Sequence, residues 1–418
     1  MNKVGNLKIY IPEFLLLIIF LFLFSLIVNF SFIQNEYIFI ENLINYEGGF
    51  VRRGLLGWLA YNFYVILKIP PEFFFKLIYS SAYFFLFYLI SQTILELKKH
   101  NFYLVILILI SPATFFFQIF DTQALLRKEV FFILAIFLHT FIAKKTIYKK
   151  ISFNTYQSYF YYLIFPILLI NILIHEFQFF LLFIHYLINL IIKYFCKQKK
   201  IINFLVIYFF LSVVFFIVIF SVNENTVINI EKSLQTFIPH ISDNYGPTTM
   251  LNGNINLVIG SFLKMIINSN YYEFLQVILA FSLSIFLFLY LFNYLLDKNI
   301  NNKIKFFKKI NHKFVLNILF LLLIFIITAF DYGRLFFILT LHSIAFYLVL
   351  PSSYFKFNII FLSSHLKYLF YLLSYFLLFS LPHAHILMNK GSIINDKGSG
   401  FLNLIINLFS PFINKLLN

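Results

Sequence analysis

The segment YEGGFVRRGLLG, Tyr46–Gly57, places a carboxylate, two adjacent guanidinium groups and four glycines within a few residues. Arginine presents a planar fork that binds phosphate or carboxylate at two points, whereas lysine is a point charge. The first two glycines permit a tight turn or a close backbone approach to a ligand. The pattern indicates Glu47 as a general base and Arg52 and Arg53 as anion ligands. The alternative is an interfacial turn whose arginines extend to lipid headgroups.

Three further segments carry an acid beside a cation or a histidine. Transfer of a group from a phosphate needs a carboxylate as general base and cations that stabilise the departing phosphate. In each segment a local salt bridge or a polar turn in a short connection is the alternative. The segments are FDTQALLRKEVFF with Asp121, Arg127, Lys128 and Glu129, NILIHEFQFF with His175 and Glu176, and TAFDYGRLFF with Asp331, Tyr332 and Arg334.

Several catalytic motifs are absent from the sequence. It has no G-x-x-x-x-G-K-[ST] phosphate loop, no H-E-x-x-H and no G-x-S-x-G elbow, which argues against P-loop ATP hydrolysis and Ser–His–Asp hydrolysis. His175 and Glu176 lack a further ligand at helical spacing, so no metal site is predicted there. The single Cys196 excludes an internal disulfide framework. We predict no cofactor, and the sequence leaves a divalent metal open.

The elements that must position these residues are membrane-spanning helices. The chain has 418 residues, of which 61% are hydrophobic and 11% charged, and its mean hydropathy is +0.89. A soluble domain carries roughly 25% charged residues, so this chain cannot build a water-facing surface around one core. A span needs about 20 apolar residues. The predicted spans are 12–33, 72–92, 103–120, 129–143, 157–174, 177–195, 201–221, 273–295, 314–330, 335–350 and 366–386.

These segments predict an all-α fold, a single integral membrane domain over residues 1–418 with about eleven transmembrane helices. Two apolar helices, 54–68 and 400–414, are predicted to be interfacial rather than spanning. The sequence IPPE at 69–72 is expected to separate the first of them from the next span, because proline stops one helix and can open another. Residues 222–272, which include His240, and residues 387–400 are predicted to be longer outer-face loops.

Lysine and arginine in short loops stay on the cytoplasmic side of a membrane, and this rule predicts the orientation. With the N-terminus in the cytoplasm, the inner segments hold 20 of the 32 basic residues, and every one of the 20 is a lysine. This anchoring accounts for the net charge of +16 without nucleic-acid binding. All four arginines fall outside, against the rule. An anionic ligand on the outer face, such as a lipid phosphate or pyrophosphate, would explain them.

The order of a first span, an acidic first outer loop and an interfacial helix resembles the GT-C class of membrane glycosyltransferases over roughly the first ninety residues. The residues that carry the resemblance are Glu47 and the 54–68 helix, with Glu41 and Glu36 as further acids. The resemblance implies a catalytic acid in the first outer loop. The segments GGFVRRGLLG and DYGR are also similar to membrane proteins of bacterial surface-polysaccharide clusters, regarded as O-antigen or capsule polymerases of the Wzy type.

We therefore predict a glycosyltransferase or polymerase of surface-polysaccharide assembly in the cytoplasmic membrane. Its donor would be a sugar on polyprenyl-(pyro)phosphate and its acceptor a glycan, both handled at the outer face among membrane lipids. The alternatives are a transporter or flippase of lipid-linked saccharides, which would need charges or broken helices inside the spans, and a non-catalytic membrane protein. The catalytic candidates are Glu47, Asp121 and Asp331, and the substrate-binding candidates are Arg52, Arg53, Arg127, Lys128, His175, Glu176, His240, Tyr332 and Arg334.

Overall fold

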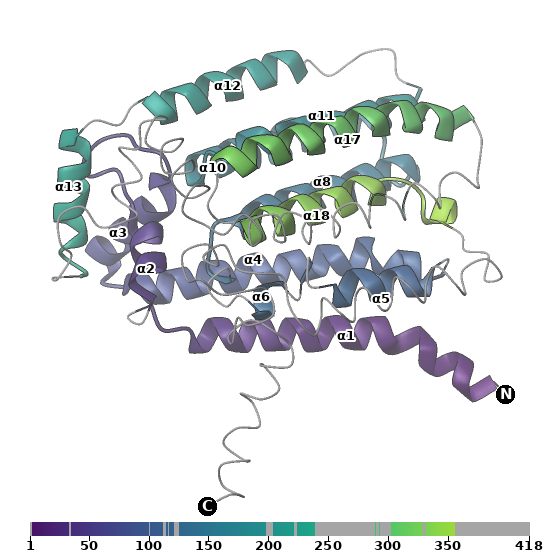
Figure 1. Cartoon of the computed structure of the whole chain (residues 1–418), viewed down its shortest axis with the longest axis horizontal. Helices are drawn as coiled ribbons and strands as arrows, with labels where there is room; N and C mark the ends of the chain where they lie inside the picture. Colours follow the sequence, from purple (N-terminus) through teal and green to yellow (C-terminus); the bar gives the residue numbers. More distant parts are fainter. Residues whose placement is uncertain are drawn as a thin grey trace, which may run out of the picture. The chain divides into compact units, whose positions relative to one another are not determined.

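Helices are the only regular elements in the described part of the chain (Figure 1). The computed structural model describes residues 2–32, 35–99, 101–111, 114–115, 117–120, 125–197, 204–220, 224–238, 289, 292, 302–328 and 332–355. Three predicted site residues, Asp121, His240 and Asp331, lie outside these ranges, and so does the predicted loop 387–400.

The helices follow the order of the apolar segments. In chain order they are α1 (Asn2–Asn29), α2 (Glu36–Leu43), α3 (Gly54–Leu67), α4 (Pro71–Thr93), η2 (Leu95–Lys99), α5 (Phe102–Ile110), α6 (Phe117–Phe120), α8 (Glu129–Ile147), α9 (Phe153–Tyr159), η3 (Phe160–Ile164), α10 (Phe165–Ile174), α11 (Gln178–Phe195), α12 (Phe204–Phe220), α13 (Glu224–Leu234), α17 (Asn302–Thr328), α18 (Tyr332–Leu348) and η5 (Ser352–Phe355).

Five helical stretches among the described residues are long and apolar enough to cross a membrane. They are Tyr10–Asn29, Pro71–Lys98, Glu129–Ile147, Phe153–Ile174 and Gln178–Phe195. Each overlaps a predicted span, which confirms the prediction of a helical chain with the composition of a membrane protein. The number of eleven spans, the orientation and the GT-C-like arrangement stay predictions.

The predicted short helix 54–68 is present as α3, and the break after it has the expected cause. The helix ends at Leu67, and Lys68 has a left-handed backbone with φ 56°. Pro71 then opens α4, where its missing N–H has no helical partner to lose. The side chains of α3 include several large exposed apolar groups, among them Trp58, Ile66 and Leu67.

The segment predicted as the outer loop 222–272 begins with a helix, α13. Its buried side chains Val227, Ile230 and Leu234 are three and four residues apart, and this spacing places them on one helix face. The surrounding asparagines and charges obscured that short apolar pattern in the sequence. The rest of the segment, from residue 239 to 272, lies outside the described residues.

The candidate span Phe153–Ile174 contains one widened π-turn, η3. Its buried residues Tyr156, Phe160, Ile164, Leu168 and Ile172 recur at every fourth position. In a helix of 3.6 residues per turn, this spacing would rotate the buried face steadily around the axis. The wider π-turn absorbs part of that rotation, so the five side chains can keep facing neighbouring helices.

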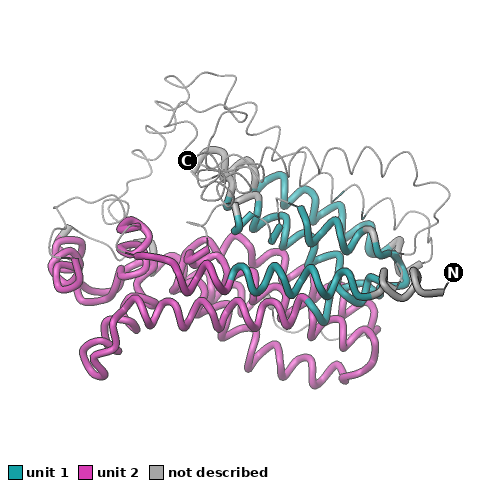
Figure 2. Tube along the Cα trace, turned by 90° about the horizontal axis from the view of Figure 1, so that it is seen from below, with its two compact units in different colours: residues 1–23, 91–124, 258–418 teal, residues 24–90, 125–257 magenta. Residues whose placement is uncertain are grey.

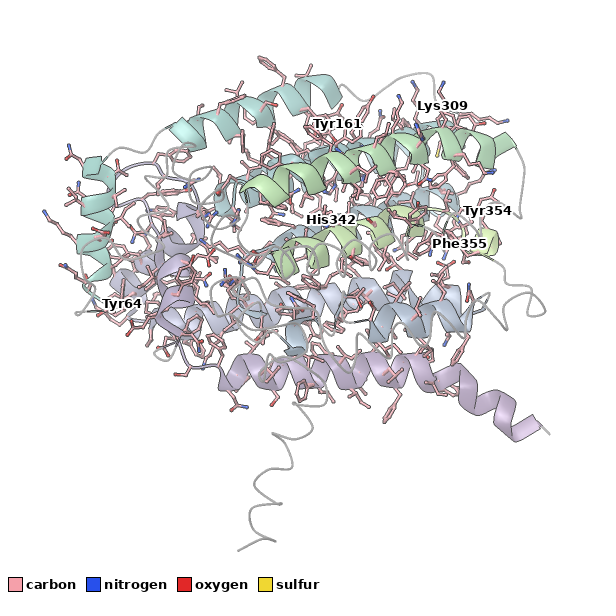
Figure 3. The ribbon with its side chains drawn as sticks, in the orientation of Figure 1. Tyr64, Tyr161, Lys309, His342, Tyr354 and Phe355 are labelled. Atoms are coloured by element: carbon pink, nitrogen blue, oxygen red, sulfur yellow. The ribbon has the colours of Figure 1, made fainter. Side chains whose placement is uncertain are left out.

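The chain divides into two compact units (Figure 2). Unit 1 comprises residues 1–23, 91–124 and 258–418, and unit 2 comprises residues 24–90 and 125–257. In unit 1, α17 packs on α18, where the rings of Phe314 and Phe346 stack with centroids 4.0 Å apart. The buried His342 of α18, labelled in Figure 3, bonds through Nδ1 to the carbonyl of Ile338, at 2.8 Å.

Unit 2 is built on the helices α8, α10 and α11, which pack against one another. At one end of these helices, Figure 1 shows α2, α3 and α13 gathered together. The contacts α2 with α3 and α3 with α10 join this end to the long helices. The loop between α2 and α3 contains the segment YEGGFVRR, so the fold brings this segment to the connections that precede α8 and α11.

Candidate functional site

Charged side chains from four separate segments meet at that end of unit 2, and we refer to them as the charge cluster. The segments are α2, the loop before α3, the residues before α8 and the connection between α10 and α11. Six of the predicted substrate-binding residues take part, together with an acid of α2. The members are Glu41, Arg52, Arg53, Arg127, Lys128, His175 and Glu176.

Arg53 is the central residue of the charge cluster. Its Nη2 and Nε donate to Glu176 Oε1, at 2.8 and 3.1 Å, and Nε also lies 3.2 Å from Oε2. On its other side, Nη1 lies 3.5 Å from Glu41 Oε1. The guanidinium fork thus joins two carboxylates that are 135 residues apart in the sequence, which a lysine could not do with the same geometry.

Glu41 connects the second pair of cations. Its Oε2 accepts from Arg127 Nη1 at 3.2 Å, and its backbone carbonyl accepts from Lys128 Nζ at 2.8 Å. Lys128 also donates to the backbone carbonyl of Arg53, at 2.9 Å. Because the last carbonyls of a helix lack helical partners, the ammonium satisfies one from α2 and ties the loop before α3 to the start of α8.

The loop between α2 and α3 owes its shape to local polar contacts. Asn45 Oδ1 accepts from the amide of Glu47 at 3.0 Å, a turn that asparagine favours. Asn45 Nδ2 donates to Ser233 of α13 at 2.9 Å. Gly49 has a backbone φ of 115°, which residues with a side chain rarely adopt. Arg53 has a left-handed φ of 67° immediately before α3.

Two glycines permit close backbone packing around this loop. A Cβ on Gly48 would lie 2.2 Å from the carbonyl oxygen of Thr226 in α13, and one on Gly57 would lie 2.1 Å from that of Ile44. Neither position leaves room for a side chain. The close backbone approach at Gly48 is therefore made to the chain's own helix α13 and not to a ligand. Gly57 lets α3 pack closely against the end of α2.

The electrostatics of the charge cluster favour the ionised forms of its central pair. Burial alone would lower the pKa of Arg53, but the carboxylates of Glu176 and Glu41 outweigh it and raise that pKa. Burial alone would raise the pKa of Glu176, but Arg53 and the neighbouring cations hold it well below its usual range. The pair is therefore ionised throughout the physiological pH range.

The other cations of the cluster are less favourably placed. Burial lowers the pKa of Lys128 to about 8, with Glu41 opposing the shift and Arg53 adding to it. Burial also lowers the pKa of Arg52, whose Nη1 lies 3.6 Å from Glu176 Oε1, beyond good hydrogen-bonding distance. Both groups would gain from a further negative charge nearby.

Counted together, the cluster carries a positive excess. The carboxylate of Glu129, which is not itself a member, acts on Lys128 as well. Among the described residues, the four cations Arg52, Arg53, Arg127 and Lys128 thus face the three carboxylates Glu41, Glu129 and Glu176, which leaves one net positive charge. Three helices also begin at the cluster, α3 after Arg53, α8 after Lys128 and α11 after the His175–Glu176 pair. These N-termini add positive potential, whereas the C-termini of α2 and α10, which end at Leu43 and Ile174, add negative potential.

The remaining predicted residues lie elsewhere. Glu47 is exposed on the turn that precedes Arg52 and Arg53, and no hydrogen bond of its carboxylate is made to a described residue. Tyr332 and Arg334 belong to α18 in unit 1. The substrate-binding roles of Tyr332 and Arg334 therefore stay predictions, as do the roles of Asp121, Asp331 and His240.

Two sets of residues escaped the sequence reasoning. Glu41 was considered only as a further acid, yet it is the buried partner of two arginines. Its neighbour Asn42 donates to the Leu126 carbonyl at 3.0 Å and accepts from Tyr79 Oη at 2.7 Å. No spacing signal marks these contacts, since 37 residues separate Asn42 from Tyr79.

The second set lies inside the candidate spans of unit 2. His139 Nδ1 is 2.9 Å from His185 Nδ1, and His139 Nε2 is 2.9 Å from the hydroxyl of Tyr156, which also contacts Asn189 Oδ1. The sequence does not show that these two histidines are neighbours, because it does not show which helices lie side by side. Among the described residues, no group of three or more metal-ligating side chains occurs.

Comparisons with known proteins add no relative to this description. No protein family, no functionally described protein and no solved structure matches the chain.

Proposed function

We propose that the chain is a membrane glycosyltransferase or polymerase that binds a polyprenyl-(pyro)phosphate-linked sugar at the charge cluster of unit 2. In this proposal the chain has about eleven spans in a GT-C-like arrangement, lies in the cytoplasmic membrane and works at its outer face. The observation that carries the proposal is the excess of cations over carboxylates in a buried cluster at the ends of candidate spans.

The position of the cluster supports a lipid-linked ligand. The candidate spans Glu129–Ile147, Phe153–Ile174 and Gln178–Phe195 each have one end at the cluster. The phosphate of a polyprenyl carrier is held at the boundary of the membrane by its hydrocarbon tail. A cationic group at the end of a span lies at that depth, and guanidinium groups bind phosphate oxygens at two points.

The cluster assigns different roles to its members. Arg53, Glu41 and Glu176 bind one another and act as positioning residues, because their hydrogen bonds are directed within the protein. Arg52 lies beside them at a longer distance from Glu176 and has a side chain that is 20% exposed. We assign to Arg52 the direct contact with the phosphate, with Lys128 contributing charge.

Glu47 remains the candidate base for the transfer. Its carboxylate is exposed five residues before Arg52, whereas those of Glu41 and Glu176 bind guanidinium groups and are poor proton acceptors. In the proposed step the acceptor hydroxyl oxygen attacks the anomeric carbon of the donor sugar and its proton passes to Glu47. The bond from that carbon to the phosphate oxygen breaks, and the electron pair leaves with the phosphate, which the cations stabilise.

A transporter of lipid-linked saccharides is the second candidate. It is favoured by the polar network of His139, His185 and Tyr156, because polar groups inside spans are characteristic of transport pathways. The two candidates differ in their dependence on Glu47. A transferase needs this carboxylate for chemistry, whereas a transporter needs no proton acceptor on an exposed turn.

The test combines a binding measurement with a transfer measurement. The full chain in phosphatidylcholine nanodiscs is titrated with undecaprenyl phosphate, and glycan chain length is followed in cells that depend on the chain. We expect Arg52→Ala to weaken binding about tenfold or more, as for one charge-assisted contact. We expect Glu47→Gln to retain binding and to abolish glycan extension.

Lys150→Ala is the matched control, because Lys150 is an exposed cation beyond the other end of α8. It removes the same charge and should leave both readouts unchanged. Equal loss of binding in Lys150→Ala and Arg52→Ala would reduce the effect to net charge and contradict the site. Normal glycan extension in Glu47→Gln with intact binding would support the transporter instead.

A further inference from the structure

His175 has a fixed tautomer, which follows from one hydrogen bond. The residue lies between α10 and α11 with an extended backbone, and its Nδ1 accepts from the amide N–H of Phe177 at 3.2 Å. An accepting nitrogen carries a lone pair, so the single proton of the neutral ring must be on Nε2. The bond joins a side chain to the backbone amide two residues on, the same span as the turns that asparagine and aspartate make with their own backbone.

The ring is also held in orientation by its aromatic neighbours. Phe132 packs edge-on against it with centroids 5.8 Å apart and planes at 84°, and Phe177 does so at 6.3 Å and 88°. The side chain is only 11% exposed. Within the described residues, its side-chain hydrogen bonds and ion-pair contact all involve Nδ1. The proton on Nε2 therefore has no acceptor there, and Nε2 is not among the fully buried polar atoms that lack a partner, so its N–H is open to a hydrogen bond with a bound ligand.

The neighbouring charges keep the ring neutral. Nδ1 lies 3.4 Å from Glu176 Oε2, and the two would form an ion pair if the ring carried a second proton. That carboxylate is instead engaged by Arg53 at 2.8 to 3.2 Å. Burial, reinforced by the positive charge of Arg53, lowers the pKa of His175 to about 3. Protonation would also break the hydrogen bond from Phe177.

We propose that His175 is a ligand-binding residue of the charge cluster that donates one hydrogen bond from Nε2–H to an oxygen of the bound phosphate. In this role it is not a general acid or base. A neutral imidazole suits an anionic oxygen because it supplies a directed donor that keeps its proton through the physiological range. The inference rests on the proposed function, since the phosphate is the ligand of that site, and it specifies how one residue recognises it.

Two substitutions separate the two ring nitrogens. The Oδ1 of asparagine can replace Nδ1 as acceptor for the Phe177 amide, but asparagine has no atom at the position of Nε2. Glutamine places an amide N–H near the position of Nε2 and no acceptor at Nδ1. His175→Asn should thus preserve the local fold and lose the ligand contact, whereas His175→Gln should preserve the contact.

The experiment uses the full chain in phosphatidylcholine nanodiscs, titrated with undecaprenyl phosphate and, separately, with inorganic pyrophosphate. We expect His175→Asn to bind undecaprenyl phosphate about ten- to a hundredfold more weakly, the factor for one hydrogen bond to a charged group. His175→Gln should stay within about threefold of the wild type. Nanodiscs that contain phosphatidylglycerol show whether an ordinary lipid phosphate competes for the same contact.

The outcomes distinguish this inference from the proposed function. If the wild type binds undecaprenyl phosphate and His175→Asn binds it equally well, the role of His175 is overturned and the site survives. If the wild type binds neither undecaprenyl phosphate nor pyrophosphate, the proposed function falls and this role with it. Nitrogen-15 NMR of labelled histidine gives an independent result: a protonated Nδ1, or titration between pH 5 and 8, would overturn the tautomer.

Discussion

The ion pair between Arg53 and Glu176 allows the sharpest test of the charge cluster. Substituting Arg53→Met leaves Glu176 buried with the guanidinium of Arg52 at 3.6 Å and the neutral ring of His175 at 3.4 Å, and it removes three contacts of 2.8 to 3.2 Å. Removing one member of a buried pair costs about 3–5 kcal/mol, because the remaining charge loses its compensation. Glu176→Met should cost a similar amount, since it leaves the guanidinium with only the longer contact to Glu41.

The double variant decides whether these costs arise from the pair. With both charges replaced by methionine, neither member of this pair leaves the other buried without its partner, so the total cost should fall below the sum of the single costs by at least about 2 kcal/mol. The free energy of unfolding is measured on the purified chain in detergent, with unfolding induced by heat and, separately, by titration with a denaturing detergent. Costs that simply add would show that Arg53 and Glu176 act independently and would refute the assignment.

A matched control is Lys150, an exposed cation beyond the C-terminal end of α8. Exposed charges contribute about 0–1 kcal/mol because water and salt screen them. Lys150→Met should therefore lower the unfolding temperature far less than Arg53→Met does. An equal effect would indicate that the loss of any lysine or arginine from this chain is damaging.

Three further predictions follow from particular contacts. Gly57→Ala should destabilise the chain by more than 2 kcal/mol in the same unfolding assay, because the new Cβ would lie 2.1 Å from the Ile44 carbonyl oxygen. Gly49→Ala is the control, since the nearest atom to its new Cβ would be 3.9 Å away. It should cost only the backbone strain of its positive φ, about 1–2 kcal/mol. The pKa of His175 is near 6.5 in the unfolded state and about 3 in the folded state. The free energy of unfolding should therefore fall as pH is lowered through that window, by about 3 kcal/mol at pH 4. His175→Asn should remove that part of the acid sensitivity. Tyr156→Phe should lower the unfolding temperature by several degrees, because it removes the hydroxyl that contacts His139 of α8 and Asn189 of α11. An unchanged temperature would show that these contacts do not contribute to stability.

The helices of this chain could be predicted from its sequence because each depends on local pattern and length. A single run of about 20 apolar residues can satisfy its backbone hydrogen bonds in lipid only as a helix. The two prolines at 70 and 71 must end the helix that precedes them. The short helix α3 and its end were predicted for that reason. Helix α13 was missed because its apolar positions are few and lie among asparagines, so only its burial against the loop before α3 reveals them.

The types of the site residues were also accessible from the sequence. Arginines predicted to lie on the side of the membrane that insertion disfavours, and a His-Glu pair between two predicted spans, indicated Arg52, Arg53, Arg127 and Glu176 as candidate site residues. The pattern did not indicate their partners. Ion pairing between residues 41, 53, 127 and 176 depends on which helix ends are adjacent, and no periodicity within one segment carries that information.

Composition and spacing thus determined by themselves that this is a helical chain with the character of a membrane protein and that its few arginines lie near the ends of apolar segments, because hydrophobic length and side-chain chemistry act locally. Only the tertiary structure decided that Glu41 is buried between two arginines, that Glu47 stays exposed, and that Phe177 fixes the tautomer of His175. Those outcomes depend on distances of about 3 Å between atoms of distant segments, which packing sets and the order of residues alone does not.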